Sequence, residues 1–279
     1  MATIRQPGAR QVRLPGLQRA EVLIGLGMLA AVAWTYLFYQ DWSMSRMDAA
    51  AMAEPATGAW GVQELLLLFV MWGVMMAAMM LPSVTPMVLL FAALSRQLAE
   101  NKSRENRAQE PPLWKTGIFL SGYLVVWTGF SVLATLGQWG LHAAALLSEM
   151  MFTTSSLVGG VVLMAAGIYQ WTPLKQACLA HCRSPLAYLM TEWRSGTWGA
   201  FRMGFIHGAY CTGCCWLLMT LLFVVGVMNL WWIIALSVFV LVEKVVSKGV
   251  WLARGSGLLL IAWGGWMLGG SVLSGYFWR

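Results

Sequence analysis

Residues 65 to 94 have the sequence LLLLFVMWGVMMAAMMLPSVTPMVLLFAAL and carry no charged side chain. An apolar run of this length is long enough to cross the roughly 30 Å hydrocarbon core of a bilayer as a helix. Pro82 and Pro86 interrupt it, so we expect either one long kinked helix or a span at about 63 to 81 with a bent extension. Six further apolar runs lie at about 22 to 39, 117 to 138, 156 to 171, 203 to 227, 230 to 247 and 256 to 276.

The composition indicates the same class of protein. Of the 279 residues, 59% are hydrophobic and only 10% are charged, and the mean hydropathy is +0.67. These values lie far from those of an average soluble domain. We therefore predict an all-α protein, a polytopic transmembrane bundle of about seven helices in a lipid bilayer. It would have a basic N-terminal tail at 1–20, one helical domain at 21–279 and a polar loop at about 96–115.

Lysine and arginine are distributed unevenly between the segments that join the apolar runs. Basic residues in short loops are retained on the cytoplasmic side of a membrane. With seven spans, 16 of the 18 basic residues fall on the side of the N-terminus, and only Arg46 and Arg279 fall on the other. This pattern predicts a cytoplasmic N-terminus. It also explains the net charge of +7 better than nucleic-acid binding does, so we expect no nucleic-acid partner.

All five cysteines lie between residues 178 and 215, beside or inside apolar sequence. They form two groups, and each group has a histidine at helical spacing. Cysteines used only for packing would be scattered, so the clustering indicates a soft-metal site or a thiol redox site. The first group is Cys178, His181 and Cys182, and the second is His207, Cys211, Cys214 and Cys215.

The spacing within each group predicts a shared helical face. His207, Cys211 and Cys214 follow one another at intervals of four and three residues, so they form one stripe with Cys215 at its edge. The first group forms a second face if the segment after Pro173 is helical, and proline suits the first turn of a helix. We expect the two faces to meet on the cytoplasmic side.

Methionines of the second apolar run would reach the same half of the membrane. Met71, Met75 and Met79 repeat at four-residue intervals, which gives a thioether stripe. Methionine is also a common packing residue in helices, and this alternative stays open. The candidate ligands from this run are Met75, Met76, Met79 and Met80.

The types of side chain indicate which metal such a site would bind. Thiolate, thioether and imidazole ligands select Cu(I) first, and then zinc or an iron-sulfur cluster. Methionine does not suit zinc, which favours copper. Carboxylates are too few for a magnesium or calcium site. We therefore expect copper, with zinc or an iron-sulfur cluster as alternatives.

Two adjacent ionisable residues, Glu243 and Lys244, lie near the cytoplasmic end of the sixth apolar run. Charged groups at membrane depth are costly and are commonly paired. We expect either an ion pair at the membrane interface or a role as a proton relay or outer ligand.

Three segments are distinctive enough to compare with known families. They are MMAAMMLP at Met75–Pro82, YQWTPLKQACLAHCRSP at Tyr169–Pro185 and GAYCTGCCWLLM at Gly208–Met219, with Trp72 and Pro86 beside the first. They resemble a bacterial family of predicted metal-binding integral membrane proteins, a domain of unknown function, over about residues 60 to 270. The resemblance implies a location in the bacterial inner (cytoplasmic) membrane and a metal site, and it implies no particular reaction.

Three functions are compatible with these residues. The favoured function is the binding and transfer of Cu(I), with the second group as core ligands, the first group closing the site, and a metallochaperone or membrane subunit as partner. The second is a membrane thiol-disulfide oxidoreductase that cycles the Cys211 and Cys214 pair, with Cys215 as a resolving thiol. The third is a membrane-bound copper-dependent oxidoreductase with an open coordination position. Metal content, disulfide trapping and copper-dependent turnover distinguish them.

Overall fold

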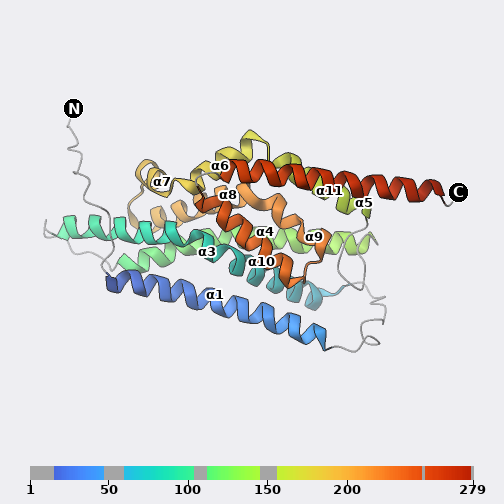
Figure 1. Cartoon of the computed structure of the whole chain (residues 1–279). Coiled ribbons are helices and arrows are strands. Elements are labelled where there is room, and N and C mark those ends of the chain that lie inside the picture. Colours follow the sequence, from blue (N-terminus) through green and yellow to red (C-terminus); the bar gives the residue numbers. More distant parts are fainter. Residues whose placement is uncertain (1–15, 47–59, 104–111, 145–155, 247–248, 278–279) are drawn as a thin grey trace.

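The computed structural model describes residues 16–46, 60–103, 112–144, 156–246 and 249–277 (Figure 1). Every element within these ranges is a helix, so the predicted all-α class is confirmed for this part of the chain. The predicted N-terminal tail falls almost entirely outside the described residues. Each of the seven predicted apolar ranges overlaps a helix.

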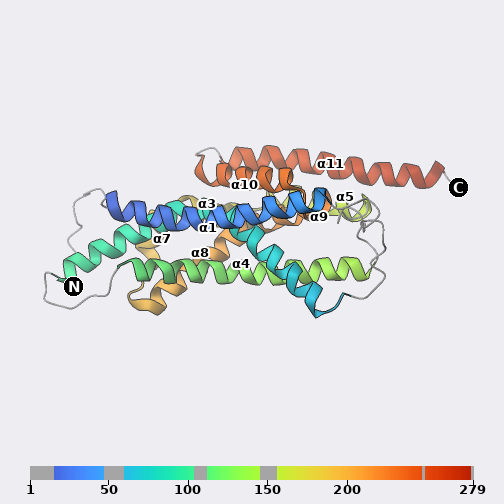
Figure 2. The same cartoon turned by 90° about the horizontal axis from the view of Figure 1, so that it is seen from below.

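Long helices run alongside one another and shorter ones fill the space around them (Figure 1). In the view turned by 90°, α10 and α11 lie together on one side and α4 lies on the other (Figure 2). The long helices are α1 (Gly16–Ser45), α3 (Val62–Ser103), α4 (Pro112–Ala143), α8 (Gly196–Thr220) and α11 (Gly249–Phe277). The shorter ones are α5 (Ser156–Tyr169), α6 (Pro173–Arg183), α7 (Pro185–Glu192), α9 (Leu222–Val225) and α10 (Leu230–Val245).

Four helical segments among the described residues are long and apolar enough to cross a membrane. A fifth candidate is the pair α5 and α6, which meets the condition only as a pair and is bent by 64° at its break. Helix α10 has 16 residues, fewer than the roughly 20 that cross the hydrocarbon core. The prediction of seven spans is therefore not confirmed, and the orientation of the N-terminus stays a prediction. The four segments are Gly16–Ser45, Val62–Ala99, Leu113–Ala143 and Gly196–Val225.

Helix α3 continues through both prolines of the second apolar run. It extends over 42 residues with Pro82 and Pro86 inside it, so the run forms one helix and not two separate segments. The kink expected at the prolines stays a prediction. Helix α3 ends at Ser103 and α4 begins at Pro112, so both helices extend into the range predicted as a polar loop.

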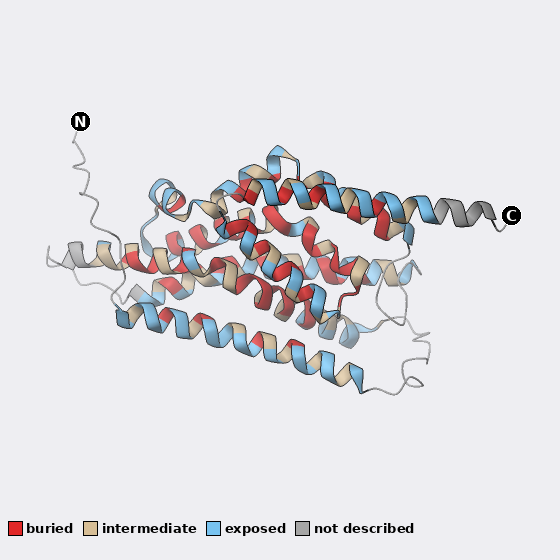
Figure 3. Ribbon diagram, viewed as in Figure 1, coloured by how far each residue is buried: buried red, intermediate tan, exposed pale blue. Residues whose placement is uncertain are grey.

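Helix α8 packs closely against α4, and glycines make that approach feasible. A Cβ atom at Gly204 would overlap the backbone of Phe119, and one at Gly122 would overlap the backbone of Phe201. Small residues at a helix crossing let two backbones come together. The other side of α8 packs against α6. Buried residues concentrate on α3 and α8, whereas α1 is largely exposed (Figure 3).

Candidate metal centre

The buried face of α8 carries three of the five cysteines. Cys211, Cys214 and Cys215 are each at most 1% exposed, and His207 lies on the same buried face one turn earlier. The thiols of Cys214 and Cys215 donate to the carbonyl oxygen of Cys211 at 3.0 and 3.1 Å. All five cysteines are free thiols. The stripe that the spacing predicted therefore points into the protein.

The segment after Pro173 is helical, as predicted, and it forms α6. Thr172 caps the start of this helix, because its hydroxyl oxygen accepts a hydrogen bond from the Lys175 backbone N–H at 3.3 Å. Cys178 lies directly over Gly213 of α8, and a Cβ atom on that glycine would lie 2.9 Å from its sulfur. Cys182 of α6 and Cys211 of α8 line the same cavity. The two cysteine groups thus lie on facing helices.

These thiols do not form a ready-made coordination shell. In the part of the chain that the structure describes, no group of three or more His, Cys, Asp or Glu side chains is placed to hold a metal ion. Ligation of a metal would require thiol rotation or a small shift of α6 toward α8. The assignment of individual ligands therefore stays a prediction.

Cys211 has polar partners from two other helices. Lys244 of α10 donates to its sulfur at 3.0 Å and to the hydroxyl of Ser83 at 3.0 Å. The Tyr123 hydroxyl of α4 lies 3.1 Å from the same sulfur. Lys244 is only 8% exposed, so its charge needs compensation inside the protein. An ammonium group beside sulfur stabilises negative charge on that sulfur, including the charge of a metal-bound thiolate.

Glu243 and Lys244 do not form the interfacial ion pair that was one of the two expectations for them. The Glu243 carboxylate instead accepts from Lys175 of α6, with Nζ 2.7 Å from Oε1 and 3.0 Å from Oε2. Lys175 also donates to Gln170, and both members of the pair are at most 1% exposed. The uneven distribution of basic residues predicts that Lys175 and Lys244 lie at the cytoplasmic side of the membrane. Both are in fact buried and link helices.

His207 lies in an aromatic environment. Its ring centroid is 6.4 Å from that of Phe119, 6.0 Å from that of Tyr123 and 5.7 Å from that of Tyr188. The side chain is 3% exposed, and its Nδ1 atom has no hydrogen-bond partner among the described residues. Burial raises the pKa of Tyr188, whose hydroxyl donates to the Met203 carbonyl at 2.8 Å. An unpartnered imidazole nitrogen in such a place is free to bind a ligand.

His181 is placed differently from the cysteines beside it in the sequence. Its ring stacks on Tyr210 of α8 with centroids 4.0 Å apart. Its Nδ1 lies 2.9 Å from the carbonyl oxygen of Ala177, to which it donates. His181 therefore marks the contact between α6 and α8.

The methionines of α3 are buried along the same interior. Met80 is the one that the contacts link most directly to Cys211, because the Tyr123 hydroxyl lies between them and donates to the Met80 carbonyl at 3.5 Å. The Ser83 hydroxyl, which accepts from Lys244, lies 4.0 Å from the Met80 sulfur. A role in packing alone stays open. The buried members of this run include Met71, Met75, Met76, Met79 and Met80.

A family model described as "PpoB2: Copper chaperone" matches residues 69–267 of the chain. The chain belongs to this copper chaperone family. The matched region contains both cysteine groups, both histidines of those groups and the candidate methionines of α3. No curated protein and no solved structure matches the chain. The expected association with copper is thereby supported at the level of the family, whereas zinc and iron-sulfur clusters gain no support.

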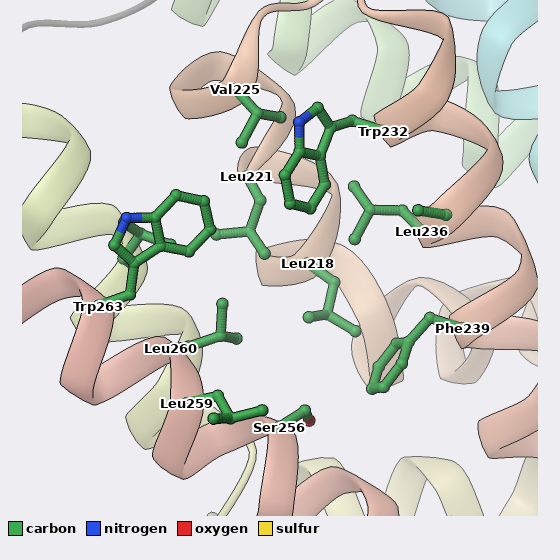
Figure 4. A pocket seen from close by; sticks show the side chains of 12 residues that line it. Leu218, Leu221, Val225, Trp232, Leu236, Phe239, Ser256, Leu259, Leu260 and Trp263 are labelled. Carbon is green, nitrogen blue, oxygen red and sulfur yellow. The ribbon is translucent and has the colours of Figure 1, made fainter.

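One cavity of this copper chaperone family member has an almost entirely apolar lining. It has a volume of about 340 Å³ and is lined by residues of α5, α8, α9, α10 and α11 (Figure 4). Its described lining residues are apolar except for Ser256 and the indole N–H groups of Trp232 and Trp263. The Ser256 hydroxyl donates to the Ala253 carbonyl at 2.9 Å. This cavity therefore has no side chain suited to copper.

Sequence reasoning did not find several residues that surround the thiols. Lys175 has a recognisable signal, because it precedes Cys178 and Cys182 by three and seven residues and so shares their helical face. Tyr123 and Ser83 have no comparable signal. Only the packing of α4 and α3 against α8 and α10 brings Tyr123 to Cys211 and Ser83 to Lys244.

Proposed function

We propose that this copper chaperone family member is an integral protein of the bacterial cytoplasmic membrane that binds Cu(I) between α6 and α8 and transfers it to a partner. The observation that carries the proposal is that the cysteines of α6 face those of α8, because Cys182 and Cys211 line one cavity and Cys214 shares the buried face of Cys211. These three thiols are the proposed main ligands. Cys215, Cys178 and His207 adjoin them, His181 lies at the helix contact, and the α3 methionines, led by Met80, would pass the ion along.

The chemistry of the interior supports Cu(I) as the cargo. Thiolates and thioethers are soft ligands, which prefer Cu(I) over harder ions. The Glu243 carboxylate of α10 is paired with Lys175. A transfer site must also release its ion. Thiols that lie close together without forming a closed shell suit that requirement, because a fully preorganised site would bind more tightly.

The outer surface of the helices supports placement in a membrane. Helix α1 exposes large apolar side chains along its length, among them Ile24 at 57% and Val32 at 72% exposure. Helix α11 does the same with Leu259 and Trp266. Soluble monomers rarely expose contiguous apolar faces of this kind. We propose seven spans with the N-terminus in the cytoplasm, which puts the contact between α6 and α8 on the cytoplasmic side.

Metal analysis of the purified protein tests the proposal. The protein in detergent is loaded with Cu(I), freed of excess metal and analysed for copper per chain. We expect stoichiometric copper in the unaltered chain and its loss in the double variant Cys211→Ser, Cys214→Ser. Leu218→Val is the matched control, because it removes buried volume from the same helix and leaves every thiol in place. Equal copper in the thiol variant and the control would contradict the proposal.

The two enzymatic alternatives stay predictions with distinct readouts. A protein that binds no copper but cycles reversibly between a dithiol and a disulfide at Cys211 and Cys214 would be a thiol oxidoreductase. Turnover of an oxidisable substrate that depends on copper would indicate a copper oxidoreductase. Competition between Cu(I) and zinc for the same protein tests the choice of metal.

A further inference from the structure

A second cavity, of about 220 Å³, lies where α3, α6, α8 and α10 meet. Two of the proposed copper ligands line it, one of them half-buried and the other almost fully buried. The cavity thus extends from these thiols to the end of α6 and the start of α7. Its polar and sulfur-bearing lining residues are Ser83, Cys182, Arg183, His207, Cys211 and Lys244.

The described lining of this cavity is positively charged. Arg183 and Lys244 contribute two cations, and none of the described residues that line it is acidic. The carboxylate closest in sequence, Glu243, is turned toward Lys175 and lies 2.7 Å from its ammonium nitrogen. The buried His207 adds an imidazole nitrogen without a hydrogen-bond partner. The cavity therefore favours an anion over a cation.

We propose that copper reaches this site through the cavity as an anionic complex of Cu(I) with thiolates, and not as a free cation. The inference rests on the proposed function. Lys244 lies 3.0 Å from the Cys211 sulfur, so any species that approaches this sulfur also approaches an ammonium group. A free Cu(I) cation would be repelled by the ammonium group at such a distance. A cleft lined by charges of one sign raises the local concentration of ligands of the opposite charge.

Transfer then takes place by ligand exchange without a change of oxidation state. The donor is a Cu(I) ion held by two carrier thiolates, with one net negative charge. Two protein thiols replace the two carrier thiolates, and each carrier thiolate leaves as a thiol with the proton of the thiol that replaced it. Copper stays Cu(I), two copper–sulfur bonds break and two form, and the charge inside the cavity is unchanged by the exchange.

The size of the cavity limits the donor. A volume of about 220 Å³ is smaller than the roughly 300–1,000 Å³ of a typical small-molecule pocket. It suits a Cu(I) complex of two small free thiolates, or one held by two cysteine side chains that a protein donor presents. Both sources have the same chemistry, which is Cu(I) bound by thiolate with net negative charge.

A series of copper donors that differ only in charge tests the inference. The donors are Cu(I) complexes of a sulfonate-bearing, an uncharged and an ammonium-bearing small thiol, each in excess. We expect the rate of copper transfer to the full-length protein to fall in that order, by about tenfold from first to last. A parallel series with acidic and basic cysteine peptides distinguishes protein-presented thiolates from free thiols. A charge order in either series supports the inference and identifies the source.

Two variants connect the charge order to the cavity. Lys244→Met and Arg183→Gln each remove a lining cation, and both should flatten the dependence on donor charge. Arg254→Gln is the control, because it removes a cation that lies over the Trp171 and Trp251 rings, outside this cavity. Equal transfer from all donors, or a charge order unchanged in both variants, would overturn the inference and leave copper binding intact. A protein that takes copper from no donor would overturn the proposed function itself.

Discussion

Replacement of Lys175 by Met should destabilise the protein strongly. Lys175 and Glu243 form an ion pair at 2.7 Å, and neither side chain is more than 1% exposed. Methionine fills most of the space of lysine, so packing is largely preserved. The carboxylate of Glu243, however, loses its counter-charge in a place without solvent. Removal of one partner from a buried ion pair costs about 3–5 kcal/mol, and we expect the free energy of unfolding to fall by that amount.

Adding Glu243→Leu to Lys175→Met distinguishes the effect of the unpaired charge on stability from the effect of altered packing. In the double variant Lys175→Met, Glu243→Leu, no buried charge is left without a partner. Replacement of a whole buried pair by apolar side chains is often neutral or stabilising by about 1–4 kcal/mol. The double variant should therefore recover most of the stability that the single variant loses. Circular dichroism during denaturant unfolding in detergent measures the free energy of unfolding of both variants.

The same pair of variants also tests how α6 is held. Lys175 of α6 bonds to Glu243 of α10, and it shares a helical face with Cys178 and Cys182. Loss of the ion pair should loosen α6 and lower copper retention, and the double variant should restore part of it. A single variant that costs less than about 1 kcal/mol, or a double variant as unstable as the single one, would refute this reasoning.

Three further predictions concern the surroundings of the site. Tyr123→Phe removes the hydroxyl 3.1 Å from the Cys211 sulfur, and it should cost about 0.5–1.5 kcal/mol of stability and weaken copper binding in a chelator competition. Gly204→Ala should destabilise by at least about 1–3 kcal/mol in thermal unfolding, because the methyl group overlaps the backbone of α4. Gly137→Ala is its control, since the methyl group there meets open space and should be neutral or stabilising. Removal of copper by a Cu(I) chelator should lower the melting temperature without abolishing the helical circular dichroism signal, in contrast to a small zinc-dependent domain.

The coarse fold follows from the sequence because it depends on local properties. A long apolar run predicts a helix, because a backbone away from water must form its hydrogen bonds within the segment. Every predicted run overlaps a helix. The number of spans does not follow in the same way. The run at 230 to 247 gives a helix of 16 residues, and the run at 156 to 171 ends at a bend of 64°. Hydropathy predicts that a segment is buried in lipid or protein, but it does not distinguish between the two.

The contacts around the thiols depend on which faces meet, and a single sequence does not contain that information. Helical spacing puts Lys175 on the same face of α6 as Cys178 and Cys182, but the partner of Lys175, Glu243, is 61 residues beyond Cys182. In the sequence, Lys175 lies between two apolar runs, so it is expected in a loop. Its burial becomes visible only when α6 and α10 are in contact.

Geometry explains why Glu243 and Lys244 have separate partners. Consecutive residues of an α-helix point about 100° apart, so adjacent charged side chains face different neighbours. In α10 one of them reaches α6, through Lys175, and the other reaches α8, through Cys211. Adjacent residues of a single helix therefore contact both of the helices that carry the thiols. A shift of α6 toward α8, by which the proposed copper site would close, would change the distances at these two contacts, so we expect substitutions in α10 to alter both the stability of the protein and its binding of copper.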